Sequence, residues 1–178
     1  MVGKWEELSR KILFEKYGRG MLEIQYRLPD GREEDFYIKH ERDFVRIFAI
    51  TKDEKVIAVR KFVPGPGRIV VDLPAGYIRE GEQVWQTAER ELRDETGYKG
   101  QLYFVAKTLG DGYTDVTGYV MAARNCEKVL ENPPETKTEF LEVVLLPVLE
   151  VRKWIKGGSN FSSDIQAWYL GLDYLRLL

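Results

Sequence analysis

The chain is poor in several features, and each shortage excludes a class of protein. It holds one cysteine and can form no internal disulfide, which is typical of proteins in a reducing cytosol. The N-terminus is polar and lacks the apolar core of a signal peptide, and the apolar runs are too short to span a bilayer. We therefore expect a cytoplasmic protein with no membrane partner.

Neither sign of charge is in clear excess. The 27 Lys and Arg residues almost balance the 29 Asp and Glu residues, and the net charge of −2 gives no general attraction to nucleic acid. A phosphate-bearing ligand would have to be held by local positive charge or by metal ions. The 178 residues do contain an apolar fraction of 44%, which is enough for the core of one domain with a small appendage.

Turn signals and apolar periodicity predict strands, a helix, further strands and a helical C-terminal region. The predicted strands cover residues 21–28, 34–39, 44–50, 56–62, 69–73, 103–107, 118–123 and 140–146. The predicted helices cover residues 83–95, residues 148–155 and a segment that begins near Ser163 with the pattern of a capping box. This order indicates the α/β class, with a mixed sheet covered by helices. Residues 1–40 form a strand appendage in this interpretation, and residues 41–178 form the main domain.

The most informative segment is residues 76–98, GYIREGEQVWQTAERELRDETGY. Glu91, Asp94 and Glu95 share one side of its predicted helix, because residues three and four apart are neighbours on a helix surface. Like charges placed in this way repel one another unless divalent cations neutralise them. Since Mg²⁺ prefers oxygen ligands and binds a few carboxylates together with substrate phosphates, the cluster indicates metal-assisted hydrolysis of a phosphate compound.

The same segment resembles the signature box of the Nudix hydrolases. Gly76 is followed after five residues by Glu82 and, after seven more, by the run RELRDETGY at residues 90–98. Asp94 is the one departure, because the family pattern has Glu there. Residues 56–76 and the segment TEFLEV that begins at Thr138 resemble the ADP-ribose and nucleoside-diphosphate-sugar pyrophosphatase branch. The resemblance implies the Nudix fold, an α/β/α sandwich around a mixed β-sheet with an N-terminal β appendage.

Carried over position by position, the resemblance implies a set of site residues. The implied catalytic residues are acidic: Glu91, Asp94, Glu95 and Glu139. Glu139 would help bind metal or activate the attacking water, with Glu135 and Glu142 as nearby alternatives. The implied metal ligands are the carbonyl of Ala75 and the side chains of Glu91, Asp94 and Glu95. The implied structural residues of the box are Gly76, Glu82, Arg90 and Gly97, with Glu82 and Arg90 paired.

The implied substrate-binding residues lie outside the box: Trp5, Phe36, Arg60 and Asp111. Trp5 and Phe36 could stack on a nucleobase, although core or dimer packing is the ordinary role of such side chains. Two positions depart from the branch: Val63 stands where an arginine that contacts substrate is common, and Asp111 where a proline is common. His40, the one histidine, is expected to have a surface or hydrogen-bonded structural role.

The resemblance implies Mg²⁺-dependent hydrolysis of the pyrophosphate bond of a nucleoside diphosphate derivative, with Mn²⁺ as a substitute cofactor. ADP-ribose or another nucleotide sugar is the expected substrate. Two alternatives stay open: a pyrophosphohydrolase of dinucleotide polyphosphates or nucleoside triphosphates, and a non-catalytic ligand sensor with the Nudix fold. In this branch the appendage commonly takes part in a dimer, so we expect a homodimer that binds a small nucleotide and no nucleic acid.

Overall fold

The computed structural model describes residues 3–131, 140–157 and 165–177. The chain divides into two compact units. The smaller unit contains residues 1–43 and 108–118, and the larger unit contains residues 44–107 and 119–178. The role expected for residues 1–40, in dimerisation and substrate binding, stays a prediction. Of the helices in the described part of the chain, none has the length and apolar character needed to cross a membrane.

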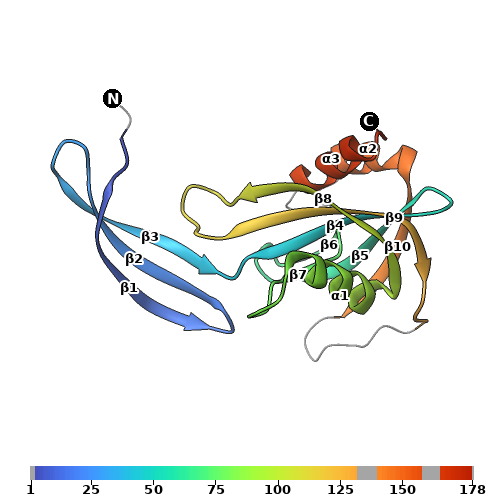
Figure 1. Cartoon of the computed structure of the whole chain (residues 1–178), viewed down its shortest axis with the longest axis horizontal. Helices are drawn as coiled ribbons and strands as arrows, with labels where there is room; N and C mark the ends of the chain where they lie inside the picture. The colour runs from blue at the N-terminus through green and yellow to red at the C-terminus, as the bar shows by residue number, and fades with distance from the viewer. Residues whose placement is uncertain (1–2, 132–139, 158–164, 178) are drawn as a thin grey trace. The chain divides into compact units, whose positions relative to one another are not determined.

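The smaller unit is built on an antiparallel sheet with the strand order β1–β2–β3 (Figure 1). Its strands are β1 (Glu6–Lys16), β2 (Arg19–Arg27) and β3 (Glu33–Glu41). Tyr17 and Gly18 join β1 to β2 in a tight turn with positive φ angles of 57° and 72°. The sequence did not predict β1, because this edge strand is mostly exposed and shows no clean alternation of apolar and polar residues.

Residues 108–118 belong to the smaller unit because hydrogen bonds attach them to β3. The backbone N–H of Lys39 donates to the carbonyl of Tyr113 at 2.8 Å, and the N–H of Asp115 donates to the carbonyl of Lys39 at 3.2 Å. His40 adds a side-chain link, with its Nδ1 atom 2.6 Å from Oδ2 of Asp115. The sole histidine therefore has the hydrogen-bonded structural role expected from the sequence.

The larger unit is built on a sheet with the path β10–β5–β4–β9–β8, to which β6 is added at β5 and β7 at β4. Its strands are β4 (Phe44–Thr51), β5 (Lys55–Val63), β6 (Arg68–Asp72), β7 (Ala75–Tyr77), β8 (Tyr98–Leu109), β9 (Thr117–Lys128) and β10 (Leu141–Pro147). β5 runs antiparallel to both β4 and β10, whereas β4 and β9 run in the same direction (Figure 1). The sheet is therefore mixed, as predicted.

Helices cover both faces of this sheet: α1 (Val84–Thr96) on one, α2 (Val148–Gly157) and α3 (Ile165–Tyr174) on the other. The alternation of β4 separates two core clusters. Ile47 packs with Leu92 of α1, whereas Phe48 packs with Trp168 of α3, their ring centroids 6.0 Å apart. Full burial of each such side chain contributes roughly 1.5–3 kcal/mol. This arrangement confirms the predicted α/β/α sandwich.

Most predicted elements of the larger unit are confirmed within a few residues of their expected bounds. α1 begins after Gln83, whose N–H donates to Oε1 of Gln86 at 2.8 Å, and it ends before Gly97, which has a left-handed φ of 77°. The strand β7 was not predicted, and β8 begins five residues before the expected strand. Ser163, the predicted start of the last helix, lies outside the described residues.

Candidate active site

The candidate site lies where α1 faces β7 and the end of β5. β7 is held against β4 by strand pairing, with Gly76 opposite Val45 and Ala75 opposite Arg46. Immediately before β7, the carbonyl of Pro74 accepts a hydrogen bond from Ile47 N–H at 2.9 Å. The first residues of the signature box are therefore fixed to the sheet, and they present backbone groups to the carboxylates of α1.

Gly76 lies directly against Glu91. A Cβ atom at Gly76 would overlap the carboxylate of Glu91, so a glycine is needed to let this side chain lie along β7. The carboxylate also forms an ion pair with Arg90, the preceding residue of α1. Glu91 is therefore held between the backbone of β7 and a guanidinium group.

Glu95 is the buried carboxylate of the site, with 6% of the residue exposed. Its Oε2 atom accepts a hydrogen bond from the N–H of Ala75 at 2.9 Å, and Nζ of Lys61 lies 4.0 Å from its Oε1 atom. A buried carboxylate needs such partners, because an uncompensated charge in the protein interior is costly. The fold therefore fixes the side chain of Glu95, a residue of α1, against the backbone of β7 and beside the ammonium group of Lys61.

Glu82 and Arg90 brace the loop before α1 against the helix. Nε and Nη2 of Arg90 donate to the two carboxylate oxygens of Glu82, each at 2.8 Å, and Nη2 also donates to the carbonyl of Tyr77 at 3.2 Å. The hydroxyl of Thr87 donates to the same carboxylate at 2.8 Å. Hydrogen bonding from Arg90 lowers the pKa of Glu82 to about 2, and the pKa of Arg90 is raised in return. The predicted pair is thus present.

Asp94 differs from the two glutamates of α1. It is partly exposed, and its Oδ1 atom accepts a hydrogen bond from Nε of Arg93 at 2.9 Å. In the described part of the chain, no three Asp, Glu, His or Cys side chains converge as a formed metal site. The three carboxylates Glu91, Asp94 and Glu95 instead interact with three different groups. These interactions offset the repulsion expected between the carboxylates.

The donor set nevertheless fits a hard divalent cation. Glu91 and Glu95 stand one helical turn apart, both close to the backbone of β7 at Gly76 and Ala75. These groups offer carboxylate and carbonyl oxygens, which are the ligands that Mg²⁺ prefers. Glu139 lies outside the described residues, and so does its alternative Glu135.

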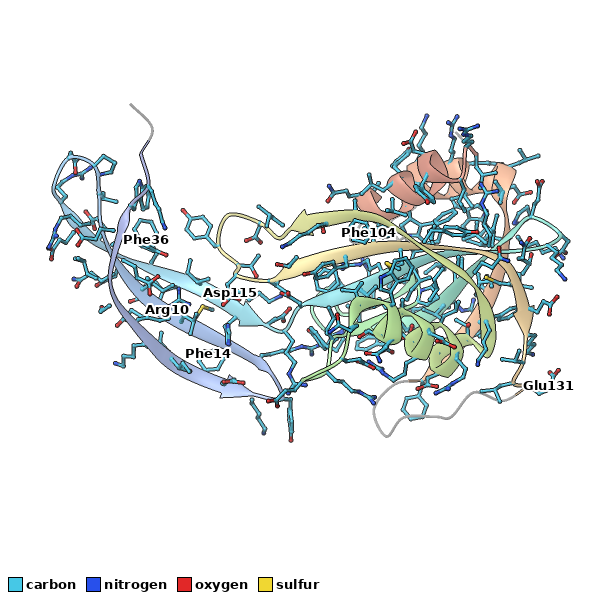
Figure 2. All side chains as sticks on the ribbon, viewed as in Figure 1. Arg10, Phe14, Phe36, Phe104, Asp115 and Glu131 are labelled. Carbon is cyan, nitrogen blue, oxygen red and sulfur yellow. The ribbon has the colours of Figure 1, made fainter. Side chains whose placement is uncertain are left out.

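Three of the four predicted substrate-binding residues fall in the smaller unit. Trp5 and Phe36 pack together with Tyr26, with ring centroids 5.2 Å apart for Trp5 and Phe36 and 5.9 Å apart for Tyr26 and Phe36. Phe36 lies on β3 (Figure 2). Asp111 lies in a turn of the same unit, where its Oδ1 atom accepts a hydrogen bond from Tyr113 N–H at 2.8 Å.

Arg60, the fourth predicted substrate residue, lies in the larger unit. It is paired across the strands with Glu142 of β10, and its Nε atom donates to Oε2 of that carboxylate at 2.9 Å. Lys61, the next residue of β5, was not among the predicted site residues. Because side chains alternate along β5, Lys61 lies on the same face as buried Val59, and this parity was the signal that could have assigned it to the site.

Comparison with known proteins agrees with the fold and the box. Residues 40–169 match the NUDIX domain, so the chain belongs to the Nudix family. It is a hydrolase that acts on phosphorus-containing anhydrides. A solved structure described as a crystal structure of ADP compounds hydrolase superposes with a TM-score of 0.82 at 19% identity, covering 99% of this chain and 96% of that one, which supports the fold.

Within the family, the chain is similar to proteins of the ADP-ribose pyrophosphatase-like branch. ADP-ribose pyrophosphatase of Bacillus subtilis (strain 168) is 29% identical over 152 residues, which cover 84% of this chain and 80% of that protein. ADP-sugar pyrophosphatase of Mus musculus is 35% identical over 100 residues, or 53% of this chain and 46% of that protein. The methanol dehydrogenase activator of Bacillus methanolicus is 26% identical over 152 residues, with coverage of 84% and 80%.

Proposed function

We propose that the protein is a Mg²⁺-dependent pyrophosphatase that hydrolyses ADP-ribose or another nucleotide sugar. With ADP-ribose, water attacks one phosphorus of the pyrophosphate, and the products are AMP and ribose 5-phosphate. The observation that carries the proposal is the position of Glu95, a buried carboxylate fixed to the N–H of Ala75 one turn from Glu91. The similarity to ADP-ribose and ADP-sugar pyrophosphatases supports the substrate class.

Glu91, Glu95, Asp94 and the carbonyl of Ala75 would hold the cation, and Mn²⁺ could replace Mg²⁺. When bound, such a cation offsets charge on phosphoryl oxygens and promotes formation of hydroxide from water. The chain's own contribution is to fix these oxygens, because β7 holds Glu95 and the Glu82–Arg90 pair holds the loop. Glu139 is proposed as the base that takes the proton of the attacking water.

The smaller unit would supply recognition of the nucleotide and the contact between two subunits. Trp5 and Phe36 offer ring faces for a nucleobase, and Asp111 offers a polar group. Arg60, a residue of the larger unit, is a further proposed contact for the substrate. The edge strand β1 exposes apolar side chains, with 56% of Ile12 and 61% of Phe14 accessible. Apolar side chains exposed on an edge strand favour pairing with another chain, so we propose a homodimer through β1, in a cytoplasmic protein.

A substrate panel tests the proposed function. The panel contains ADP-ribose, other nucleotide sugars, dinucleotide polyphosphates and nucleoside triphosphates, each assayed with Mg²⁺ and with a chelator, followed by product analysis. We expect release of AMP from ADP-ribose or an ADP-sugar only with the cation. Faster turnover of a dinucleotide polyphosphate or a triphosphate would select that alternative. Tight binding of ADP-ribose without any hydrolysis would indicate a ligand sensor.

The Glu95→Gln variant tests the site within the same assay. We expect it to fold normally and to lose at least two orders of magnitude in kcat, since it removes a charge that the cation needs. Glu89→Gln is the matched control, because Glu89 lies on the same helix but is exposed and pairs with Lys99 at 3.5 Å. Near-normal turnover of Glu95→Gln would refute the proposed metal site.

A further inference from the structure

Lys61 is a basic residue inside the site that the signature box does not include. It lies on β5 two residues after Val59, whose side chain is fully buried, and the alternation of the strand turns Lys61 toward the face covered by α1. Its side chain is 21% exposed, whereas the side chain of its neighbour Arg60 is 51% exposed and pairs with Glu142. Lys61 is therefore the less solvated of two adjacent cations on this strand.

The ammonium group of Lys61 lies on one side of the Glu95 carboxylate. Its Nζ atom is 4.0 Å from Oε1, while Oε2 on the other side accepts the hydrogen bond from Ala75 N–H at 2.9 Å. At this distance the contact is an ion pair without a direct hydrogen bond. The ammonium therefore supplies positive charge to a carboxylate that is also a proposed ligand for a divalent cation.

We propose that Lys61 is a positioning residue for Glu95. In the cation-free protein the ammonium group of Lys61 acts as an internal counter-cation to the Glu95 carboxylate, and it opposes the binding of a divalent cation there. The inference rests on the proposed role of Glu95 as a metal ligand. A divalent ion on Glu95 would repel an ammonium a few ångströms away, and this repulsion is strong where solvent is largely excluded. Lys61 thus raises the cation concentration at which the site fills.

The contact between Lys61 and Glu95 also stabilises the fold of the cation-free protein. Glu95 is buried, so loss of the ammonium leaves its charge with less compensation when no cation is present. A variant without the lysine charge is then destabilised in chelator and recovers when a cation binds. Tighter cation binding is informative, because damage to the fold would weaken binding instead.

The test is a titration of Mn²⁺ onto the full chain, with free Mn²⁺ measured by electron paramagnetic resonance. We expect Lys61→Gln to bind Mn²⁺ on the order of tenfold more tightly than the wild type, and Lys61→Arg to keep the wild-type affinity. Lys55→Gln is the matched control, since Lys55 begins the same strand about 20 Å away and pairs with Asp53 at 2.8 Å. This control should leave Mn²⁺ affinity unchanged.

A second readout is the melting temperature in chelator and in saturating Mg²⁺. The rise produced by Mg²⁺ should be larger for Lys61→Gln than for the wild type, and Lys61→Met, which keeps the aliphatic stem, should behave in the same way. Unchanged or weaker Mn²⁺ binding in both variants overturns the inference. If Glu95→Gln loses Mn²⁺ binding in that case, the proposed metal site still stands. Equal binding by the wild type and Glu95→Gln overturns both proposals.

Discussion

Arg90 donates two hydrogen bonds to Glu82, and both carboxylate oxygens are engaged at 2.8 Å. The pair joins the loop before α1 to the middle of the helix, eight residues later in the sequence. Bidentate contacts between a guanidinium and a carboxylate are stronger and more directional than single hydrogen bonds. Because Arg90 also contacts Glu91, the pair fixes the start of the box in relation to a proposed metal ligand.

The Glu82→Gln variant should show a pH-dependent loss of stability. The pKa of Glu82 is lowered from 4.5 to about 2 in the folded protein, chiefly by the hydrogen bond from Arg90. A lowered pKa stabilises the fold above the unfolded value, and this contribution is lost as the pH falls from about 4.5 toward 2. We expect the variant to unfold more easily by about 2 kcal/mol at pH 7 and the difference to shrink at pH 3.

Urea unfolding followed by tryptophan fluorescence at both pH values measures this difference. Glu80→Gln is the control, because Glu80 is an exposed residue of the same loop. A difference between wild type and Glu82→Gln that is the same at pH 3 and pH 7 would contradict the ion-pair interpretation.

The Gly76→Ala variant should impair the site more than the fold. A Cβ atom at Gly76 would overlap the carboxylate of Glu91, which is the far end of a flexible side chain and can move away. We therefore expect a melting temperature within a few degrees of the wild type and kcat/KM at least tenfold lower. Gly65→Ala is the matched control, since a Cβ atom there meets nothing within 4 Å. Full activity of Gly76→Ala would show that the position of Glu91 does not matter.

The parts of the fold that could be predicted from the sequence are those set by local chemistry. The sequence displays the apolar stripe of the helix that begins after Gln83 and the glycine that ends it, Gly97. β1 was missed because it is an exposed edge strand, and β7 was missed because it depends on a contact between distant segments. β7 has three residues and exists because Gly76 and its neighbours pair with β4, a contact between segments about 30 residues apart.

The candidate site shows the same division. Glu91, Asp94 and Glu95 could be predicted as one group because a single helix carries them. The parity of β5 could have assigned Lys61 to the α1 side of the sheet, but its contact with Glu95 could not be predicted, because the contact depends on how β5 packs against α1. The present pairing of Asp94 with Arg93 was also missed, since the helical spacing indicated repulsion among acids and did not indicate how each acid would be neutralised.

The Gly97→Ala variant should be destabilised for two separable reasons. Gly97 has φ = 77°, a left-handed conformation that costs an alanine about 1 kcal/mol, and a Cβ atom would also overlap the carbonyl oxygen of Leu130. That carbonyl belongs to the backbone, and two N–H groups nearby, of Val129 and Leu130, donate to the carbonyl of Gly97. We expect a total loss of roughly 2–4 kcal/mol in the free energy of unfolding.

Gly31→Ala isolates the contribution of the backbone conformation. Gly31 has φ = 89°, but a Cβ atom there meets nothing within 4 Å. Chemical unfolding of both variants should therefore show a smaller loss for Gly31→Ala. Equal losses would mean that the contact with Leu130 contributes nothing.

The Phe36→Ala variant distinguishes substrate stacking from ordinary packing in the aromatic cluster of the smaller unit. If a nucleobase stacks on Phe36, KM for ADP-ribose should rise about tenfold while kcat changes little, because stacking on one aromatic ring is worth about 1–3 kcal/mol. Tyr37→Ala is the matched control, since Tyr37 is the next residue of β3, is 55% exposed and points to the other face. Steady-state kinetics and melting curves are measured on all three proteins. A lower melting temperature with unchanged KM would assign Phe36 to packing against Trp5 and Tyr26, and base recognition would then depend on other residues.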